Sequence, residues 1–287
     1  MRTLSANAYA KINLTLNITG RREDGYHTLE SVMHTVSLCD RVLLRQSRSG
    51  CITLGCNLPY LPRDGRNLAV RAAEGFFAAA GFRNPGLEIH IKKVIPVGAG
   101  MAGGSTDAAA VLRLLDRMYR HTLSRNRMDE LALSLGADVP FCMRRGAALA
   151  AGIGEELSPA PPLPDCHLVI CKPPVPVSTK RAYGLLDECA ALEHPPAAAM
   201  LSALEKANLR NVCAALGNSF QTPIEEDKPV IGDIRRALLA QGAMGALMSG
   251  SGSAVFGIFE ELKQAQNAAA ALRTRFRDVF LVKPVSV

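Results

Sequence analysis

Residues 96–107 read Pro96-Val-Gly-Ala-Gly-Met-Ala-Gly-Gly-Ser-Thr-Asp107, the most glycine-dense stretch of the chain. Four of the seven residues from Gly98 to Gly104 are glycine, and apolar residues at helical spacing follow over 108–118. Glycines let main-chain amides approach an anion, and the unpaired N–H groups of a helix N-terminus favour phosphate. A tight turn with a Ser/Thr cap is the alternative. The glycine density favours a phosphate-binding loop, to which Ser105 and Thr106 add two hydroxyls.

Two other glycine motifs fit this segment less well. Gly98, Gly100 and Gly103 satisfy G-x-G-x-x-G, but a dinucleotide-binding unit needs a strand after the helix and an acidic residue about 20 positions on. The next predicted element here is a second amphipathic helix, which ends at Gly136. A P-loop is excluded because no lysine stands before the hydroxyl residues: Gly104 is followed directly by Ser105.

Strands and helices alternate irregularly around this loop. Residues 8–19 alternate apolar and polar as one strand, which places Lys11 and Asn13 side by side on its polar face. The remaining patterns predict a turn at 20–25, strands at 27–45, 87–92, 168–171, 255–259 and 279–285, a second turn at 249–253, and helices at 68–80, 108–118, 128–135, 180–187, 199–207, 231–240 and 265–276. Without a regular βαβ alternation, the chain is predicted to be α+β. The proline-rich stretch 158–164 is interpreted as a domain linker.

Composition limits the class of protein. The 287 residues are 48% hydrophobic, enough for one large or two ordinary domains. No apolar run approaches the ~18 residues of a membrane span, and the first residues lack a signal peptide's apolar stretch, so we expect a cytoplasmic protein that does not associate with membranes. Eight cysteines without a CxxC pair and six histidines without HExxH predict reduced thiols and no dedicated metal site. Any metal is then expected to arrive with the substrate.

The net charge of +7 leaves two classes of partner open. An RNA-binding protein needs a basic face with interleaved aromatic residues, but the basic residues are scattered and aromatic residues make up only 5% of the chain. Small polyanions explain the surplus equally well, so no nucleic-acid partner is expected.

The loop resembles the second motif of the GHMP kinase family, Pro-x-x-x-Gly-Leu-(Gly/Ala)-(Gly/Ser)-Ser-(Ser/Thr)-x-Ala-Ala, over 96–109. The first and third motifs correspond to 10–14 and 248–254, so the resemblance spans nearly the whole chain in the right order. Met101 and Ala102 stand where Leu and Gly are commoner, and Thr106 replaces a frequent Ser. An alanine at 102 is expected to exclude a conformation that needs glycine.

Further matches narrow the resemblance within the family. Gly25-Tyr26-His27, Asn67-Leu68 and 136–141 (Gly-Ala-Asp-Val-Pro-Phe) are similar to the members that act on CDP-linked methylerythritol. The resemblance implies ATP-dependent phosphorylation of the 2-hydroxyl of that substrate, in the isoprenoid route that does not use mevalonate. It also implies a two-domain α+β fold, with a domain like domain 2 of ribosomal protein S5 over 1–157 and a ferredoxin-like domain over 165–287.

The resemblance also implies roles for individual residues. Asp138 would be the general base, and Lys11 would pair with it and stabilise the developing alkoxide; a helix N-cap and a solvated strand lysine are the alternative readings. The implied nucleotide-binding residues are Asn67, Pro96, Val97, Gly98, Ala99, Gly100, Met101, Ala102, Gly103, Gly104, Ser105 and Thr106. The implied substrate-binding residues are Asn13, Tyr26, His27 and Thr179. ATP and Mg²⁺ are the implied cofactors, with no metal ligand assigned, and the oligomeric state stays open between monomer and homodimer.

Overall fold

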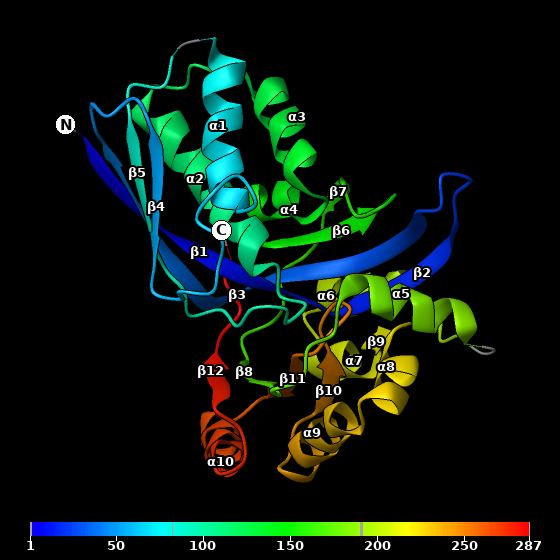
Figure 1. Ribbon diagram of the computed structural model, residues 1–287. Coiled ribbons are helices and arrows are strands. Elements are labelled where there is room, and N and C mark those ends of the chain that lie inside the picture. The colour runs from blue at the N-terminus through cyan, green and yellow to red at the C-terminus, as the bar shows by residue number, and fades with distance from the viewer. Residues whose placement is uncertain (1, 82, 190–191, 287) are drawn as a thin grey trace. The chain divides into compact units, whose positions relative to one another are not determined.

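The computed structural model describes residues 2–81, 83–189 and 192–286, and the chain divides into two compact units (Figure 1). Unit 1 comprises Met1–Ala10, Leu38–Val97 and Ala102–Arg144. Unit 2 comprises Lys11–Ser37, Gly98–Met101 and Arg145–Val287. Each unit is therefore built from segments that lie far apart in the sequence. The domain limits at 1–157 and 165–287 stay a prediction.

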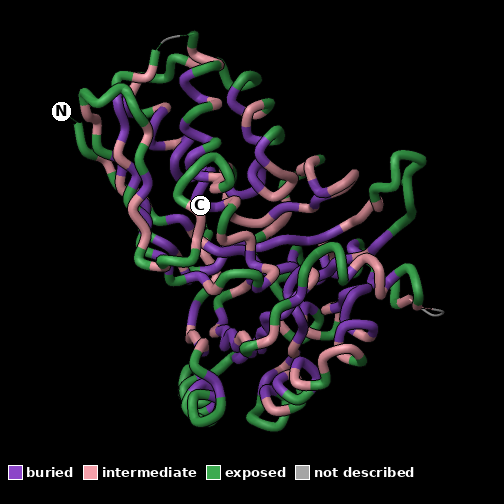
Figure 2. Tube along the Cα trace, in the orientation of Figure 1, coloured by how far each residue is buried: buried purple, intermediate pink, exposed green. Residues whose placement is uncertain are grey.

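Unit 1 combines strands with the four helices α1 to α4. The second half of β3 (His27–Gln46) runs antiparallel to β5 (Leu87–Lys92), and β4 (Ile52–Cys56) pairs with β5 in parallel. The helices α1 (Leu68–Ala80) and α2 (Gly103–Met118) pack against each other, and α3 (Arg125–Leu135) and α4 (Asp138–Arg144) also contact α2. In Figure 2, the buried class follows much of β3 and α2.

Unit 2 contains a sheet built on the first half of β3. The strand β2 (Thr15–Arg21) pairs antiparallel with β3, and the short strand β9 (Gly217–Asn218) pairs with β2 in parallel. On the other side, β6 (Ala147–Ala151) pairs with β3, and β7 (Glu156–Pro159) pairs with β6. The strand β1 (Thr3–Asn13), which belongs to unit 1 up to Ala10 and to unit 2 from Lys11, also pairs with β3.

A second sheet in unit 2 has four antiparallel strands in the order β10-β11-β8-β12. Numbered along the chain, these strands stand in the order 2-3-1-4, which is the strand order of a ferredoxin-like sheet. The helices α9 and α10 pack on its strands, and Leu16 and Ile18 of β2 belong to the same buried cluster as Phe259. The remaining elements are β8 (His167–Lys172), α5 (Thr179–Glu188), α6 (Ala197–Glu205), α7 (Leu209–Ala214), α8 (Gln221–Asp227), α9 (Pro229–Ala240), β10 (Gly245–Met248), β11 (Val255–Phe259), α10 (Leu262–Arg273) and β12 (Asp278–Val282).

The first predicted strand differs from the structure. The single strand expected over 8–19 is wrong, because the chain breaks at Leu14, where β1 ends and β2 begins a new pairing with β9. The proline-rich segment 158–164 begins within β7, and the buried Leu163 donates its N–H to Nε2 of His34 at 3.0 Å; its role as a domain linker stays a prediction.

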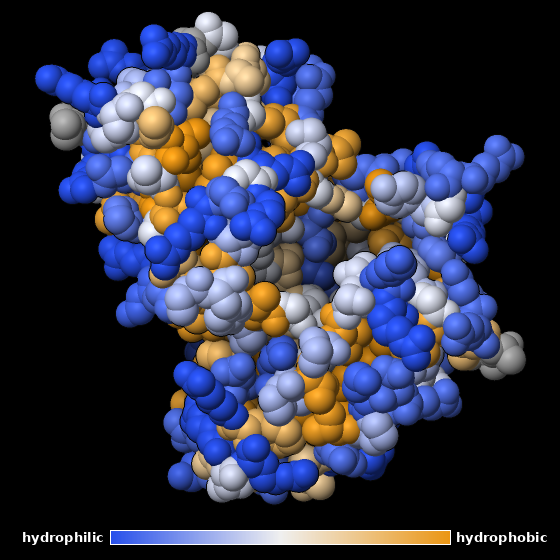
Figure 3. Space-filling model, viewed as in Figure 1, coloured by the Kyte–Doolittle hydropathy of each residue, from blue (hydrophilic) through white to orange (hydrophobic). Residues whose placement is uncertain are grey.

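The surface in Figure 3 mixes hydrophilic residues with separate hydrophobic areas on the face in view. Among the described residues, the exposed aromatic side chains are Tyr26 and Tyr60. That is a small stacking surface for single-stranded nucleic acid. Within the described part of the chain, no helix is long and apolar enough to cross a membrane.

Candidate active site

The segment Gly98–Met101 is fastened to the serine-rich turn at 249–254 within unit 2. Oγ of Ser249 donates to the carbonyl of Gly100 at 3.0 Å, and the N–H of Ala254 donates to the carbonyl of Ala99 at 3.2 Å. Gly100 has φ 71°, and a Cβ built on it would lie 2.0 Å from the carbonyl oxygen of Ser249. Close backbone approach therefore requires glycine at this position.

The turn itself is held by a buried asparagine that the sequence analysis did not single out. Nδ2 of Asn218 donates to the carbonyls of Met248 and Gly250, both at 2.8 Å, and Oγ of Ser253 donates to the carbonyl of Val175 at 2.8 Å. The glycine-serine composition of the turn was visible in the sequence. Asn218 carries no motif, and only the tertiary contacts reveal its role.

Some side chains of the loop are packed in the interior and others are exposed to solvent. Ala99 and Met101 are buried, whereas Val97 is exposed. Met101 accepts a hydrogen bond at its carbonyl from the N–H of Lys11 at 3.3 Å, within unit 2. The buried side chains of Ala99 and Met101 and the hydrogen-bonded carbonyl groups therefore anchor the loop. Its main-chain N–H groups are suited to bind an anion.

The loop leads into α2, whose N-terminus has no side-chain cap among the described residues. The N-cap residue, Ala102, has φ 57° and ψ 31°, in the left-handed region. The expectation that alanine would exclude such a conformation is wrong, because alanine enters this region at a cost of about 1–2 kcal/mol. Ser105 is half-buried and Thr106 is buried, so the hydroxyl of Ser105 is the more accessible of the two.

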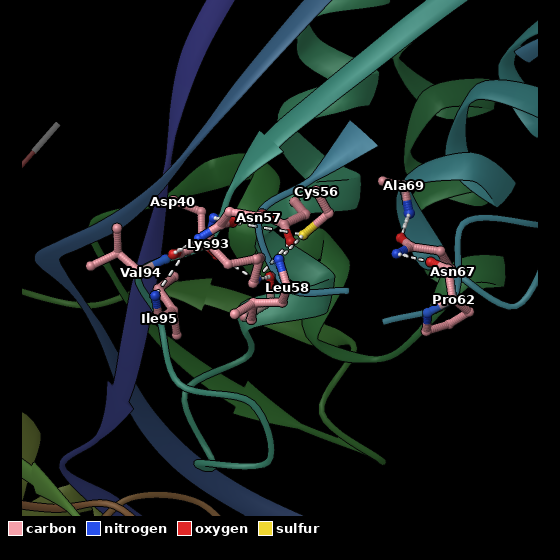
Figure 4. Close-up of polar contacts among 12 residues, drawn as sticks. Asp40, Cys56, Asn57, Leu58, Pro62, Asn67, Ala69, Lys93, Val94 and Ile95 are labelled. Atoms are coloured by element: carbon pink, nitrogen blue, oxygen red, sulfur yellow. Dashed lines mark hydrogen bonds and ion pairs between the residues drawn. The ribbon is translucent and has the colours of Figure 1, made fainter. Parts of the chain in front are cut away.

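A buried cluster of charges lies beside the start of α2 in unit 1 and was missed by the sequence analysis. Nζ of Lys93 donates to Oδ2 of Asp40, to Oδ2 of Asp107 at 2.7 Å and to the carbonyl of Gly103 at 3.2 Å. Oδ1 of Asp40 accepts from the N–H groups of Val94 and Ile95 at 2.5 and 2.8 Å (Figure 4). The cluster therefore joins β3, the end of β5 and α2.

The two titrating groups of this cluster respond differently to burial. Burial raises the pKa of Asp107 to about 7; Lys93 opposes this rise and the neighbouring Asp40 adds to it. Burial by itself lowers the pKa of Lys93, but the two carboxylates outweigh it and the pKa is raised. Oδ1 of Asp107 is buried with no hydrogen-bond partner among the described residues.

Lys11 and Asn13 lie side by side, as their alternation in the strand predicts. Nζ of Lys11 donates to Oδ1 of Asn13 at 2.6 Å, Nδ2 of Asn13 donates to Oγ of Ser31 at 2.8 Å, and Ser31 donates to the carbonyl of Thr15 at 2.6 Å. Lys11 is only 5% exposed, so it is not the solvated strand lysine of the alternative reading. The hydrogen-bonded amide of Asn13 therefore holds the side-chain nitrogen of Lys11 in place.

The predicted substrate residues Tyr26, His27 and Thr179 also belong to unit 2. Nε2 of His27 lies 2.8 Å from Oδ1 of Asp187, and its ring stacks on Tyr183 at a centroid distance of 4.6 Å. The side chain of Tyr26 is 62% exposed. No sequence motif marks Tyr183 or Asp187. They lie more than 150 positions from His27, and only the fold makes them its neighbours.

Thr179 is the first residue of α5, and the side chain of Ser178 before it caps that helix. This cap orients the first turn of α5, on which Thr179 stands.

Asn67 and Asp138 belong to unit 1. Asn67 caps α1: its Oδ1 accepts from the N–H of Ala69 at 3.0 Å and its Nδ2 donates to the carbonyl of Pro62 at 2.9 Å (Figure 4). Within the described ranges, this leaves one N–H and one lone pair of its amide for another partner. Asp138 is the first residue of α4 and is half-buried. The convergence of Lys11 and Asp138 stays a prediction.

Two sequence profiles match the chain: GHMP kinases N terminal domain over residues 67–146, and GHMP kinases C terminal over 200–278. A 4-diphosphocytidyl-2-C-methyl-D-erythritol kinase of Clostridium botulinum (strain Eklund 17B / Type B) is 39% identical over 98% of this chain and 100% of its own length. The protein of that name from Syntrophomonas wolfei is 41% identical over 98% of each chain. The crystal structure of a 4-(cytidine 5'-diphospho)-2C-methyl-D-erythritol kinase matches with a TM-score of 0.83 at 37% identity, over 99% of this chain and 100% of that one.

Proposed function

The chain belongs to the GHMP kinase family, and we propose that it transfers the γ-phosphoryl group of ATP to the 2-hydroxyl of 4-diphosphocytidyl-2-C-methyl-D-erythritol, releasing ADP. The reaction belongs to the non-mevalonate route to isoprenoids. The observation that carries the proposal is a glycine segment with anchored carbonyls that runs directly into a helix without a side-chain cap among the described residues. Similarity over the full length to kinases of this substrate supports the acceptor.

The anionic tail of ATP is bound by main-chain N–H groups of the loop and of the first turn of α2. Main-chain donors are fixed before the nucleotide arrives, so they stabilise negative charge with little reorganisation. Asn67, Pro96, Val97 and the hydroxyls of Ser105 and Thr106 complete the proposed nucleotide site.

The phosphoryl transfer depends on positioning and on charge compensation. Asp138 accepts the proton of the attacking 2-hydroxyl, and Lys11 offsets the negative charge that develops on the alkoxide and the moving phosphoryl group. The hydrogen bond from Lys11 to Asn13 supports this role, because it orients the side-chain nitrogen of Lys11.

The cytosine end of the acceptor is recognised by Tyr26 and His27. If Nε2 of His27 carries the proton and donates to Asp187, Nδ1 is an acceptor suited to the amino group of cytosine. The exposed ring of Tyr26 offers a stacking face for the base. Thr179, at the start of α5, is proposed as a further polar contact.

The phosphoryl donor is the magnesium complex of ATP, in which the metal enters as part of the substrate. Among the described residues, no group of three His, Cys, Asp or Glu side chains forms a metal site. Phosphate oxygens and water are the ligands that Mg²⁺ prefers in nucleotide complexes. We also propose a cytoplasmic location, in keeping with an ATP substrate.

The test is ADP release in the presence of the diphosphocytidyl substrate, with mevalonate and homoserine as comparison acceptors. Activity restricted to the diphosphocytidyl substrate supports the proposal, and equal or higher activity with the comparison acceptors contradicts it. Asp138→Asn is expected to lower kcat by about 10²–10⁴-fold, since a general base contributes that much. Lys11→Met is expected to lower kcat by about 10²–10³-fold.

Matched controls are available on exposed positions of the same chain. Asp165→Asn and Lys263→Met remove the same charges from exposed residues and are expected to leave turnover unchanged. Unaltered turnover in both Asp138→Asn and Lys11→Met would refute the proposed mechanism.

A further inference from the structure

The cluster of Asp40, Lys93 and Asp107 contains two carboxyl groups and one ammonium group, all buried. With both carboxyl groups ionised, the cluster carries one negative charge; with one of them protonated, it is neutral. A buried uncompensated charge is costly, so the proton content of this cluster matters for whatever binds beside it.

The hydrogen bonds decide which carboxyl group takes the proton. Asp40 accepts from Lys93 at Oδ2 and from two main-chain N–H groups at Oδ1. Asp107 accepts from Lys93 at Oδ2 only, and its Oδ1 is buried with no partner among the described residues. An anionic oxygen without a donor costs more than a neutral hydroxyl in the same place, so Asp107 is the site of protonation.

The cluster is directly coupled to the start of α2. Lys93 bonds both Asp107 and the carbonyl of Gly103, the first residue of the helix. Asp107 stands four residues further on, on the order of 6 Å along the helix axis. A negative group bound at the N-terminus of α2 is therefore close enough to repel an ionised Asp107.

We propose that Asp107 is a positioning residue whose carboxylate becomes more fully protonated from solvent when the anionic tail of the nucleotide binds at the N-terminus of α2, while Asp40 and Lys93 hold its carboxyl group in place. This inference rests on the proposed function, because it requires that ATP binds there. The proton adds to the carboxylate of Asp107 and no other bond changes. Once its carboxyl group is neutral, Asp107 no longer repels the phosphates, and the positive end of the α2 dipole attracts them without this opposition.

The charges that act on Asp107 come from two other elements. They are Lys93 after β5 and Asp40 on β3. With a pKa of about 7, Asp107 titrates near neutral pH. The helices α1, α3 and α4 also pack against α2, but within the described residues none of their charges contributes to this pKa.

The test is calorimetric titration of the intact protein with MgATP at about pH 8, in two buffers with different heats of ionisation. The wild type is expected to take up part of a proton on binding, Asp107→Asn is expected to take up none, and Asp116→Asn, an amide replacement further along α2, is expected to behave as the wild type. If binding raises the pKa of Asp107 by about one unit, wild-type affinity falls about tenfold across the titration, and the affinity of Asp107→Asn does not.

Absence of proton uptake in the wild type, or the same uptake in Asp107→Asn, would overturn the proposal. Infrared difference spectra of the wild type give a second measurement that does not depend on the variant folding: nucleotide binding is expected to produce the carbonyl stretch of a protonated carboxylic acid, and its absence contradicts the proposal. Failure of MgATP to bind at all would instead refute the proposed function, so the two failures are distinguishable.

Discussion

At Gly100 the missing side chain decides how closely two backbones approach. Gly100→Ala is expected to lower the free energy of unfolding by about 2–3 kcal/mol, because its Cβ would meet the carbonyl oxygen of Ser249 at 2.0 Å and separate the loop from the turn. Urea unfolding and ATP affinity are the measurements.

Gly98→Ala is the matched control for this prediction. Gly98 also has a positive φ, of 63°, but a Cβ there would meet no described atom within 4 Å. Its cost is expected to be only the conformational one, about 1–2 kcal/mol. Equal losses of stability and affinity in both variants would show that the contact with Ser249 contributes nothing.

Ala102 carries a strain that glycine would remove. Its φ of 57° lies in the left-handed region, which costs an alanine about 1–2 kcal/mol. Glycine avoids this strain but loses more backbone entropy on folding, which offsets part of the gain. Ala102→Gly is therefore expected to raise the free energy of unfolding by up to about 1 kcal/mol, measured by urea unfolding. Ala270→Gly, on an exposed position of α10, is expected to lower it by about the same amount. A loss of stability in Ala102→Gly would contradict the prediction.

The strand β3 contains a buried neutral histidine, His34, to which the segment 158–164 is hydrogen-bonded. Leu163 donates to Nε2 of His34, so Nδ1 carries the proton and donates to the carbonyl of Thr35 at 2.8 Å. Burial lowers the pKa of His34 below 6.5, although the bond to Thr35 opposes it. Between the folded and unfolded pKa values the unfolded chain binds more protons, so this group's stabilisation is lost as pH falls below about 6.5.

Urea unfolding at pH values above and below this range measures the effect. The loss of stability is expected to reach at most about 1.4 kcal/mol per pH unit in the wild type, and His34→Gln is expected to lack that part of the pH dependence. The contribution of Asp107 to the free energy of unfolding changes with pH in the opposite direction. Its raised pKa makes the folded state bind more protons than the unfolded state between about pH 4 and 7, so this contribution falls as the pH rises. The comparison of wild type with His34→Gln isolates the histidine. The same acid sensitivity in both proteins would contradict the assignment.

For the whole molecule, ligand binding distinguishes the kinase from an RNA-binding protein. MgATP together with the CDP-linked alcohol, at about 100 times the dissociation constant, is expected to stabilise the folded protein by about 2.7 kcal/mol and raise its melting temperature. RNA is expected to leave the melting temperature unchanged. Stabilisation by RNA alone would favour the rival function.

Local patterns predicted the elements whose stabilisation is local. Asn67 and Gly81 mark the ends of α1 because an amide cap and a left-handed glycine act within a few residues of the helix. The alternation around Lys11 and Asn13 placed them together for the same reason. The strands β4, β6 and β10 were missed, since short strands depend on their partners.

The sequence by itself determined the family, the glycine loop, the helix that follows it and the pairing of Lys11 with Asn13, because each is encoded within a few neighbouring residues. Only the tertiary structure decided that Ser249 clamps Gly100, that Asn218 holds the turn, and that Lys93 meets both Asp40, 53 positions away, and Asp107. These contacts join separate segments of the chain, and folding sets both their distances and the low-dielectric surroundings that give buried charges their pKa values.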